Sequence, residues 1–198
     1  MDDGSTDGSG EILDEYREKV EKSGGGGQRI VVIHQKNAGV SAARNSALDI
    51  ATGDWIWLID GDDIIHRSSL SNIHAVLSYS VDVVGVHIGR IEATERPKIW
   101  DIGQLNVKVS DPFHSSAMIM FMHAAWNFVI KWQFIGETRF RLFPRNEDMV
   151  FMMELMWRSG KWIFLDGPFY FWRQRDGSAV HCFQPTRKQI SEIFLLSI

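Results

Sequence analysis

The stretch Trp55-Ile56-Trp57-Leu58-Ile59-Asp60-Gly61-Asp62-Asp63 decides how this sequence folds. Its first five residues are apolar and bulky, which favours a buried β-strand, and its last four form an acidic turn. Three carboxylates in one short turn repel each other, and a divalent cation is the usual reason for such a cluster. In open α/β sheets, ligands bind beyond the carboxyl ends of the strands, where this turn falls. The stretch therefore predicts an α/β sheet with a ligand site at its edge.

A second acidic turn, Asp2-Asp3-Gly4-Ser5-Thr6-Asp7-Gly8-Ser9, opens the chain. Its carboxylates can accept hydrogen bonds from a base N–H and from sugar hydroxyls, and its glycines let the backbone approach a ligand closely. The spacing also matches the start of a calcium loop. Against that alternative, Gly10 stands where such a loop wants an apolar residue, and Asp14 stands in place of the final glutamate.

Strand-like and helix-like segments alternate along the chain, which indicates an α/β sheet with mostly parallel strands in a single domain, 1–198. The periodicity and turn signals predict helices over 9–22, 41–53, 68–79, 146–158 and 186–198. They predict strands over 29–34, 55–60, 81–88, 162–165 and 169–172. Ser41 is the expected N-cap of the second helix.

Composition excludes several classes of protein. The formal net charge of −4 leaves no basic surplus for a nucleic-acid backbone. The single cysteine, Cys182, cannot form an internal disulfide, which fits a reducing compartment. No signal peptide is visible, and the longest apolar stretch, 118–132, is too short to span a bilayer. We expect a cytoplasmic protein and leave open peripheral attachment to the inner face of the membrane and a homodimer.

Together with Asn37-Ala38-Gly39-Val40-Ser41-Ala42-Ala43-Arg44-Asn45, the two acidic turns resemble the nucleotide-sugar site of family 2 glycosyltransferases, which have the GT-A fold. The resemblance implies a mixed, mostly parallel sheet flanked by helices. The family's domain opens with a strand and a helix before the first acidic turn, so we expect a form truncated at its N-terminus. Residues 1–88 would form the nucleotide-sugar-binding half, and 89–198 the acceptor-binding and catalytic half.

The resemblance also implies roles on the donor side. Asp60-Gly61-Asp62 is similar to the family's Asp-x-Asp motif, in which Mg²⁺ or Mn²⁺ neutralises the departing nucleoside diphosphate. Asp62 would be the direct metal ligand, and Asp60 would face the ribose or the metal. Asp2 or Asp3 would contact the base or ribose. Arg44 would reach the base or diphosphate, unless it only lies along its helix.

On the acceptor side, Glu147-Asp148 resembles the acidic pair of inverting members, with Trp126-Asn127 and Arg139-Phe140 upstream as in that pattern. Asp148 would be the base that takes the proton of the acceptor hydroxyl, with Glu147 in support. The alternative is that the pair only stabilises a helix N-terminus. Arg173 and Arg175 could contact the diphosphate or the acceptor.

The expected function is therefore metal-dependent, inverting transfer of a sugar from a nucleotide-sugar, a UDP-sugar above all, to a saccharide or lipid-linked saccharide acceptor. Family members often act in bacterial surface polysaccharide synthesis. Two alternatives stay open: a nucleotidyltransferase-like enzyme, and a truncated, inactive domain that binds carbohydrate or calcium.

Overall fold

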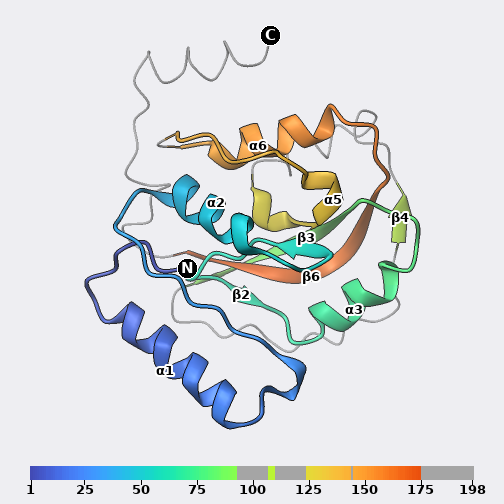
Figure 1. Ribbon diagram of the computed structural model, residues 1–198. Coiled ribbons are helices and arrows are strands. Elements are labelled where there is room, and N and C mark those ends of the chain that lie inside the picture. Colours follow the sequence, from blue (N-terminus) through green and yellow to red (C-terminus); the bar gives the residue numbers. More distant parts are fainter. Residues whose placement is uncertain (93–106, 110–123, 144, 175–198) are drawn as a thin grey trace.

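The computed structural model describes residues 1–92, 107–109, 124–143 and 145–174, which form helices packed on a mixed sheet (Figure 1). The helices are α1 (Ser9–Lys22), α2 (Val40–Ile50), α3 (Ser69–Val76), α5 (Trp132–Ile135) and α6 (Glu147–Met156), with 3₁₀ turns η1 (Gly25–Gly27) and η2 (Ala125–Asn127). The strands are β1 (Trp55–Trp57), β2 (Ile64–Ile65), β3 (Val83–Glu92), β4 (Val107–Val109), β5 (Phe128–Lys131) and β6 (Trp162–Gln174).

The strand order of the sheet is β1-β5-β3-β6-β2, and β4 also pairs with β6. Strand β6 therefore has three partners, β2, β3 and β4. It pairs in parallel with β3 from Val83↔Trp162 to Glu92↔Gln174. The other pairings between named strands, β1–β5, β3–β5, β2–β6 and β4–β6, are antiparallel. The mixed α/β sheet is thus confirmed, whereas the expectation of mostly parallel pairing was wrong for the described strands.

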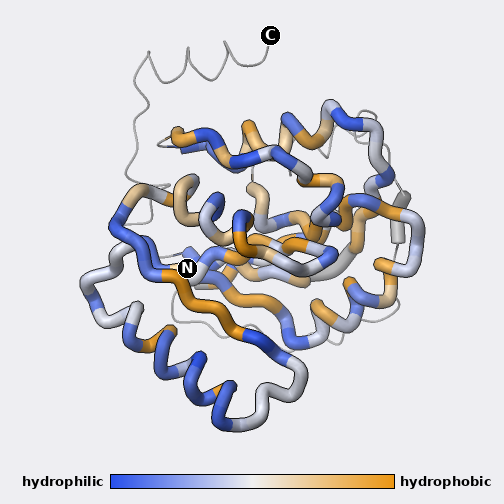
Figure 2. Tube along the Cα trace, in the orientation of Figure 1, coloured by the Kyte–Doolittle hydropathy of each residue, from blue (hydrophilic) through white to orange (hydrophobic). Residues whose placement is uncertain are grey.

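The sheet is buried on both faces, because neighbouring residues of each central strand enter different clusters. Val83, Ile130 and Trp162 belong to a cluster with Leu48 of α2 and the apolar side of α6. Their chain neighbours Val84, Val129 and Ile163 belong to a second cluster, with Ile73 and Val76 of α3. Figure 2 shows this apolar interior as orange tube along the strands.

The opening stretch of the sequence analysis folds as that pattern requires. Strand β1 spans only Trp55–Trp57, but its alternation is kept: Trp55 and Trp57 pack against the α3-side cluster, and Ile56 and Leu58 against the α6-side cluster. The acidic turn therefore follows directly on residues that pack against the two core clusters. A stretch of apolar residues bounded by carboxylates was sufficient to place this element.

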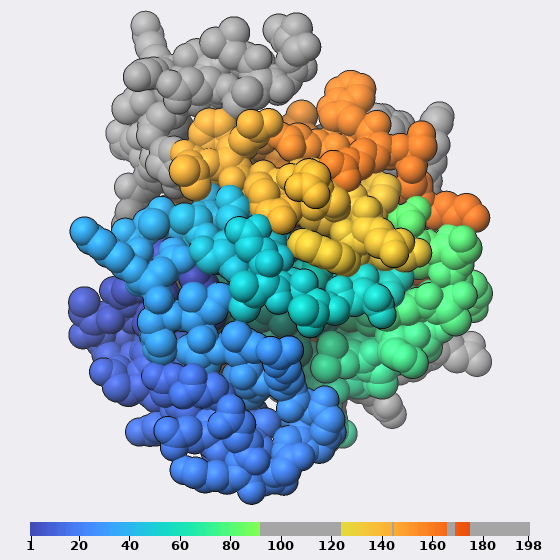
Figure 3. All heavy atoms as spheres, in the orientation of Figure 1, coloured from blue at the N-terminus to red at the C-terminus, as the bar shows by residue number. Residues whose placement is uncertain are grey.

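The N-terminal 38 residues differ most from expectation. Helix α1 has the predicted bounds, but 29–34 is extended chain without a strand partner of its own. The parallel pairing that we expected there is a single bridge, in which Asp2 N–H donates to Ile33 O at 2.8 Å and Gln35 N–H donates to Asp2 O at 3.0 Å. Figure 3 shows this segment, in blue, at the lower left of the surface.

Three further boundaries differ from the sequence pattern. Helix α2 begins at Val40 with Gly39 as its N-cap at φ 88°, a left-handed conformation that suits glycine, so Ser41 lies inside the helix. The strands expected at 162–165 and 169–172 are one continuous strand, β6. The helix expected at 186–198 lies outside the described residues. Within the described residues, no helix is long and apolar enough to cross a membrane.

Candidate active site

Arg44 joins the two acidic motifs: its contact with Glu147 spans 103 positions of the sequence and its contact with Asp60 spans 16. Its Nη2 donates to Asp60 Oδ1 at 2.9 Å, and its Nη1 donates to Glu147 Oε1 at 2.7 Å. The Arg44 side chain is 12% exposed and that of Glu147 is 10% exposed. The sequence motif of α2, the turn after β1 and the start of α6 therefore meet at one place, as a donor site facing a catalytic base would require.

The acidic turn is fixed to β6 through its last carboxylate. Asp63 Oδ2 accepts a hydrogen bond from the Tyr170 hydroxyl at 2.5 Å, and Asp63 Oδ1 accepts one from Arg173 N–H at 2.9 Å. The same hydroxyl accepts from Asp60 N–H at 3.2 Å. Burial raises the pKa of Asp63, and these two donors oppose that effect. Asp63 is thus engaged in holding the turn in place.

Asp148 lies in the first turn of α6, next to Glu147. Burial is the largest cause that raises the pKa of Asp148 to about 6; the neighbouring Glu147 carboxylate adds to it, and Arg44 opposes it. The residue before the pair, Asn146, has φ 59°. Asn146 is the only non-glycine residue with positive φ among the described residues. A left-handed backbone is tolerated by asparagine more readily than by most residues, and such outliers often mark functional sites.

The first acidic turn is anchored by hydrogen bonds at every carboxylate. Asp2 accepts from Ser5 N–H at 2.9 Å and faces His34 Nδ1 at 2.9 Å, and chiefly the His34 contact lowers the pKa of Asp2 to about 2. Asp3 accepts from Gln35 Nε2, Ala38 N–H and Gly39 N–H. Burial would raise the pKa of Asp3, but these donors outweigh it and lower the pKa. Asp3 therefore holds the loop before α2.

The calcium-loop alternative is wrong. A calcium loop wraps twelve residues around the ion, but α1 begins at Ser9, within the segment that would have to wrap. Asp7 in turn accepts hydrogen bonds from the Ser9 N–H and hydroxyl at 3.1 and 2.7 Å. Its carboxylate therefore starts the helix, and the Asp3 carboxylate faces the loop before α2.

Two predicted arginines have different outcomes. Arg173 lies on β6 beside the acidic turn; its backbone N–H reaches Asp63, while its buried Nε has no hydrogen-bond partner among the described residues. Arg175 lies outside the described residues. Of the upstream pairs, Phe140 stacks on Phe151 of α6 with ring centroids 4.1 Å apart. Trp126 stacks on Tyr170 at 4.8 Å.

The described residues offer few ligands for a metal ion. In the part of the chain that the structure describes, no group of three or more His, Cys, Asp or Glu side chains is arranged to hold one. Asp60 and Asp62 nevertheless offer carboxylate oxygens, which suit Mg²⁺ and Mn²⁺. The donor set fits such an ion if other oxygens, such as those of a diphosphate, complete its coordination.

Three residues of the site were missed by the sequence analysis. Tyr170 was recognised only as part of an aromatic strand, and its hydroxyl contact with the acidic turn spans 107 positions. Asn45 exchanges two hydrogen bonds with the Phe140 backbone, at 2.9 and 2.8 Å. His34 contacts Asp2 and also Asp14 of α1, at 3.0 Å. The only sequence signal for any of these was that Asn45 is the last residue of the quoted motif, next to Arg44.

The described chain thus combines a mixed α/β sheet with an acidic turn after β1 and an acidic pair at the start of α6. The family model for "Glycosyl transferase family 2" matches residues 1–145. The chain therefore belongs to glycosyltransferase family 2.

Curated relatives agree with this assignment. "Glycosyltransferase GlyA" and "Glycosyltransferase GlyG" of Streptococcus pneumoniae are each 29% identical to this chain over 90% of its length. "Uncharacterized glycosyltransferase EpsJ" of Bacillus subtilis is 24% identical over 90%. The chain spans 26% of the first relative, 61% of the second and 52% of the third.

Among solved structures, S. aureus TarS 1-349 in complex with UDP-GlcNAc matches with a TM-score of 0.79. The alignment covers 99% of this chain and 55% of that one, at 20% sequence identity. The complex of the same protein with UDP gives a TM-score of 0.74 at 19% identity. These likenesses confirm the GT-A-like fold.

Proposed function

We propose that this protein transfers a sugar from a UDP-sugar to an acceptor hydroxyl, with inversion at the anomeric carbon and with help from Mg²⁺ or Mn²⁺. One observation carries the proposal: Arg44 contacts Asp60 of the acidic turn and Glu147 of the acidic pair at the same time. This contact places the proposed donor-side and acceptor-side carboxylates around one guanidinium. Membership of glycosyltransferase family 2, and a neighbour of known structure that binds UDP-GlcNAc, support the class of donor.

On the donor side, Asp62 and Asp60 would hold the cation, which would neutralise the charge of the departing diphosphate. Tyr170 and Arg173 N–H keep the turn in position through Asp63. Asp2 lies at the bridge with His34, and Asp3 orders the loop that leads into α2. We propose that these two turns together receive the nucleoside and diphosphate, with Arg173 and Arg175 as further cationic contacts.

On the acceptor side, Asp148 would take the proton of the attacking hydroxyl. A pKa of about 6 keeps most of its carboxylate ionised near neutral pH and leaves it more basic than an ordinary aspartate. Glu147 is already paired with Arg44, so it supports the site and is the weaker candidate for the base. This division of roles between adjacent acids follows from their different partners.

We propose a saccharide or lipid-linked saccharide as the acceptor, in surface polysaccharide synthesis at the inner face of the membrane. Support comes from a relative named "Poly(ribitol-phosphate) beta-glucosyltransferase" of Bacillus spizizenii, which is 39% identical over 72 residues, 35% of this chain. That name describes the transfer of glucose to poly(ribitol-phosphate). A lipid-linked acceptor would bring the protein to a membrane surface.

Calorimetric titration with UDP, GDP and pyrophosphate, each with and without Mn²⁺, tests the proposal. We expect Mn²⁺ alone to bind weakly, because the described residues offer few ligands, and to bind tightly together with UDP. UDP should bind at least about tenfold more tightly than GDP, a difference of about 1.4 kcal/mol. Equal binding of all three compounds would show that the site does not read uridine. Binding without any effect of Mn²⁺ would exclude the metal.

A further inference from the structure

Building on the proposed function, we propose that Arg44 is a positioning residue that fixes the donor-side carboxylate Asp60 relative to the acceptor-side acids Glu147 and Asp148. The sequence analysis left open whether Arg44 reaches the base or diphosphate or only lies along its helix. In the structure its guanidinium already has two carboxylate partners, one on each side of the site. Arg44 lies between these two carboxylates and links the donor side of the site to the acceptor side.

The geometry requires a guanidinium. Two different nitrogens, Nη1 and Nη2, each reach a different carboxylate, at 2.7 and 2.9 Å. The planar fork of arginine can do this with one rigid group, whereas the single nitrogen of lysine is a point charge. Lysine at this position would keep the charge and lose the fixed separation between Asp60 and Glu147. That difference makes the role testable.

Packed aromatic rings hold the Arg44 guanidinium in position. The Arg44 guanidinium lies over the Phe140 ring, with 5.3 Å from Cζ to the ring centroid, and Phe140 stacks on Phe151 of α6. The neighbouring Asn45 exchanges two hydrogen bonds with the Phe140 backbone. Phe140 thus holds helix α2 and helix α6 together next to the Arg44 guanidinium. Arg44 has little freedom to swing toward a ligand.

Charge also keeps Arg44 in place. Its guanidinium faces Asp60 and Glu147 directly and acts on Asp148 through space, and burial does not overcome these carboxylates, so the pKa of Arg44 is raised. If Arg44 turned to a diphosphate, the buried Glu147 carboxylate would lose the guanidinium that pairs with it at 2.7 Å. Leaving a buried charge without its partner is strongly unfavourable. The observed pairing is therefore the stable arrangement of these groups.

The test compares Arg44→Lys and Arg44→Gln with the wild-type protein, after UDP binding in the presence of Mn²⁺ has been shown for the wild type. If the wild type does not bind UDP, the proposed function is contradicted. The role of Arg44 is then tested by the measurement on Asp148 described below. For Arg44→Lys we expect UDP affinity within about threefold of wild type and a kcat for UDP-GlcNAc at least about tenfold lower, because orientation and not binding is lost.

Arg44→Gln adds a readout that a purely structural residue would not change. Among the described groups, Glu147 and Arg44 are the charges that act on Asp148. Removing the cation should raise the pKa of Asp148 by about one unit, so the acid limb of the kcat profile moves to higher pH. The Asp148 carboxyl resonance, followed by NMR in ¹³C-aspartate-labelled protein, reports the same shift without any turnover.

Arg141→Lys is the matched control. Arg141 also uses two guanidinium nitrogens on a carboxylate, with Nε at 3.1 Å and Nη2 at 3.0 Å from Glu154 Oε1 of α6. This ion pair lies outside both acidic motifs, so the kcat and pH profile of Arg141→Lys should stay at wild-type values. The proposal is overturned if Arg44→Lys weakens UDP binding more than about tenfold with kcat unchanged, which would make Arg44 a donor ligand. It is also overturned if neither Arg44 variant moves kcat or the Asp148 resonance.

Discussion

The Tyr170 hydroxyl donates a hydrogen bond to Asp63 Oδ2 at 2.5 Å and thereby joins the last strand of the described sheet to the acidic turn after β1. Tyr170 is fully buried and stacks on Trp126, so its ring cannot follow a moving turn. The turn is therefore held by two groups of β6, the Tyr170 hydroxyl and the Arg173 N–H. A loop that must present carboxylates at a fixed place gains this rigidity from residues outside the motif.

Tyr170→Phe should lower the free energy of unfolding by about 1–2 kcal/mol, because a buried carboxylate and the Asp60 N–H both lose a partner. The pKa of Asp63 should rise, since one of the donors that oppose the effect of burial is removed. Denaturant unfolding measures the first effect. Tyr79→Phe is the control, because Tyr79 is 60% exposed, and it should change stability by less than about 0.5 kcal/mol. Equal stability of the two variants would contradict the assigned role.

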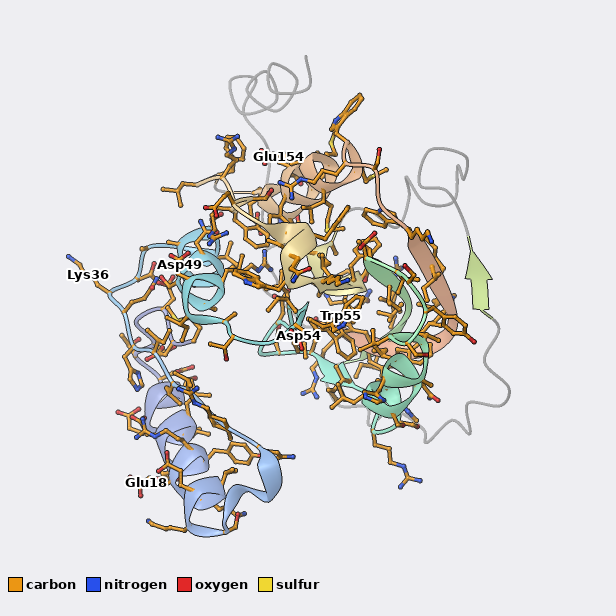
Figure 4. The ribbon with its side chains drawn as sticks, turned by 45° about the vertical axis from the view of Figure 1, so that its right-hand side comes forward. Glu18, Lys36, Asp49, Asp54, Trp55 and Glu154 are labelled. Carbon is orange, nitrogen blue, oxygen red and sulfur yellow. The ribbon has the colours of Figure 1, made fainter. Side chains whose placement is uncertain are left out.

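Asp62→Ala should weaken Mn²⁺-dependent UDP binding by more than about tenfold, about 1.4 kcal/mol, through loss of a metal ligand. Asp49→Ala removes an acid of similar charge from α2, where Asp49 is 61% exposed and pairs with Arg139 (Figure 4). That control should bind UDP as the wild type does. If both variants bind UDP equally well, Asp62 is no metal ligand.

Asp148→Asn should leave UDP binding intact and reduce sugar transfer by about 10²–10⁴-fold, because the amide keeps the shape of the side chain and cannot accept the proton. Glu154→Gln is the matched control: Glu154 lies on the same helix, α6 (Figure 4), and pairs with Arg141, which belongs to neither acidic motif. Its transfer rate should be unchanged. Full transfer by Asp148→Asn would move the role of base to Glu147.

The raised pKa of Asp148 also predicts how the stability of the protein changes with pH. Its pKa in the folded protein is raised from 3.8 to about 6, so the folded state favours the protonated form. The ionised carboxylate therefore destabilises the protein progressively as pH rises from about 4 to about 6. Asp148→Asn should be more stable than wild type by about 1–3 kcal/mol at pH 7 and equally stable at pH 3. Urea unfolding at the two pH values measures the difference, and a constant difference would contradict the raised pKa.

His34 stands between two carboxylates, Asp2 and Asp14, and Arg17 faces Asp14 at 3.2 Å. Hydrogen bonds to Asp2 first and Asp14 second raise the pKa of His34 above 6.5. The contribution of this contact to stability is thus complete at low pH and is lost as pH rises through the raised pKa. NMR titration of the imidazole should show a lower pKa in Asp14→Asn than in wild type. Glu11→Gln, on an exposed side of α1, should leave it unchanged.

How far the sequence alone determined this structure depends on the range of the contacts involved. Helix α1 was predicted with its observed bounds because its pattern is local. The segment 29–34 has the composition of a strand, but a strand also needs neighbours, and the described residues give it one bridge. For β6, two strands were predicted with a break at 166–168, yet pairing with β3 continues past that break.

The candidate site shows the same limit. The structure brings together Arg44, Asp60, Glu147 and Asp148, which the sequence motifs had singled out. Their partners could not be read from the sequence, because Arg44–Glu147 and Asp63–Tyr170 each span more than a hundred positions. The roles of these residues in catalysis and metal binding remain predictions for the measurements above.

The pairing of β3 with β6 affects how the chain folds while it is being synthesised. Residues 83–92 must wait for 162–174, which leave the ribosome roughly 4–16 s later at ordinary rates of synthesis. Until then β3 exposes an apolar edge, and β2 and β4, which also pair with β6, have no neighbour in the described sheet. Contacts of such sequence separation form slowly and leave a nascent chain prone to association. Expression at lower temperature or with chaperones should therefore raise the soluble yield.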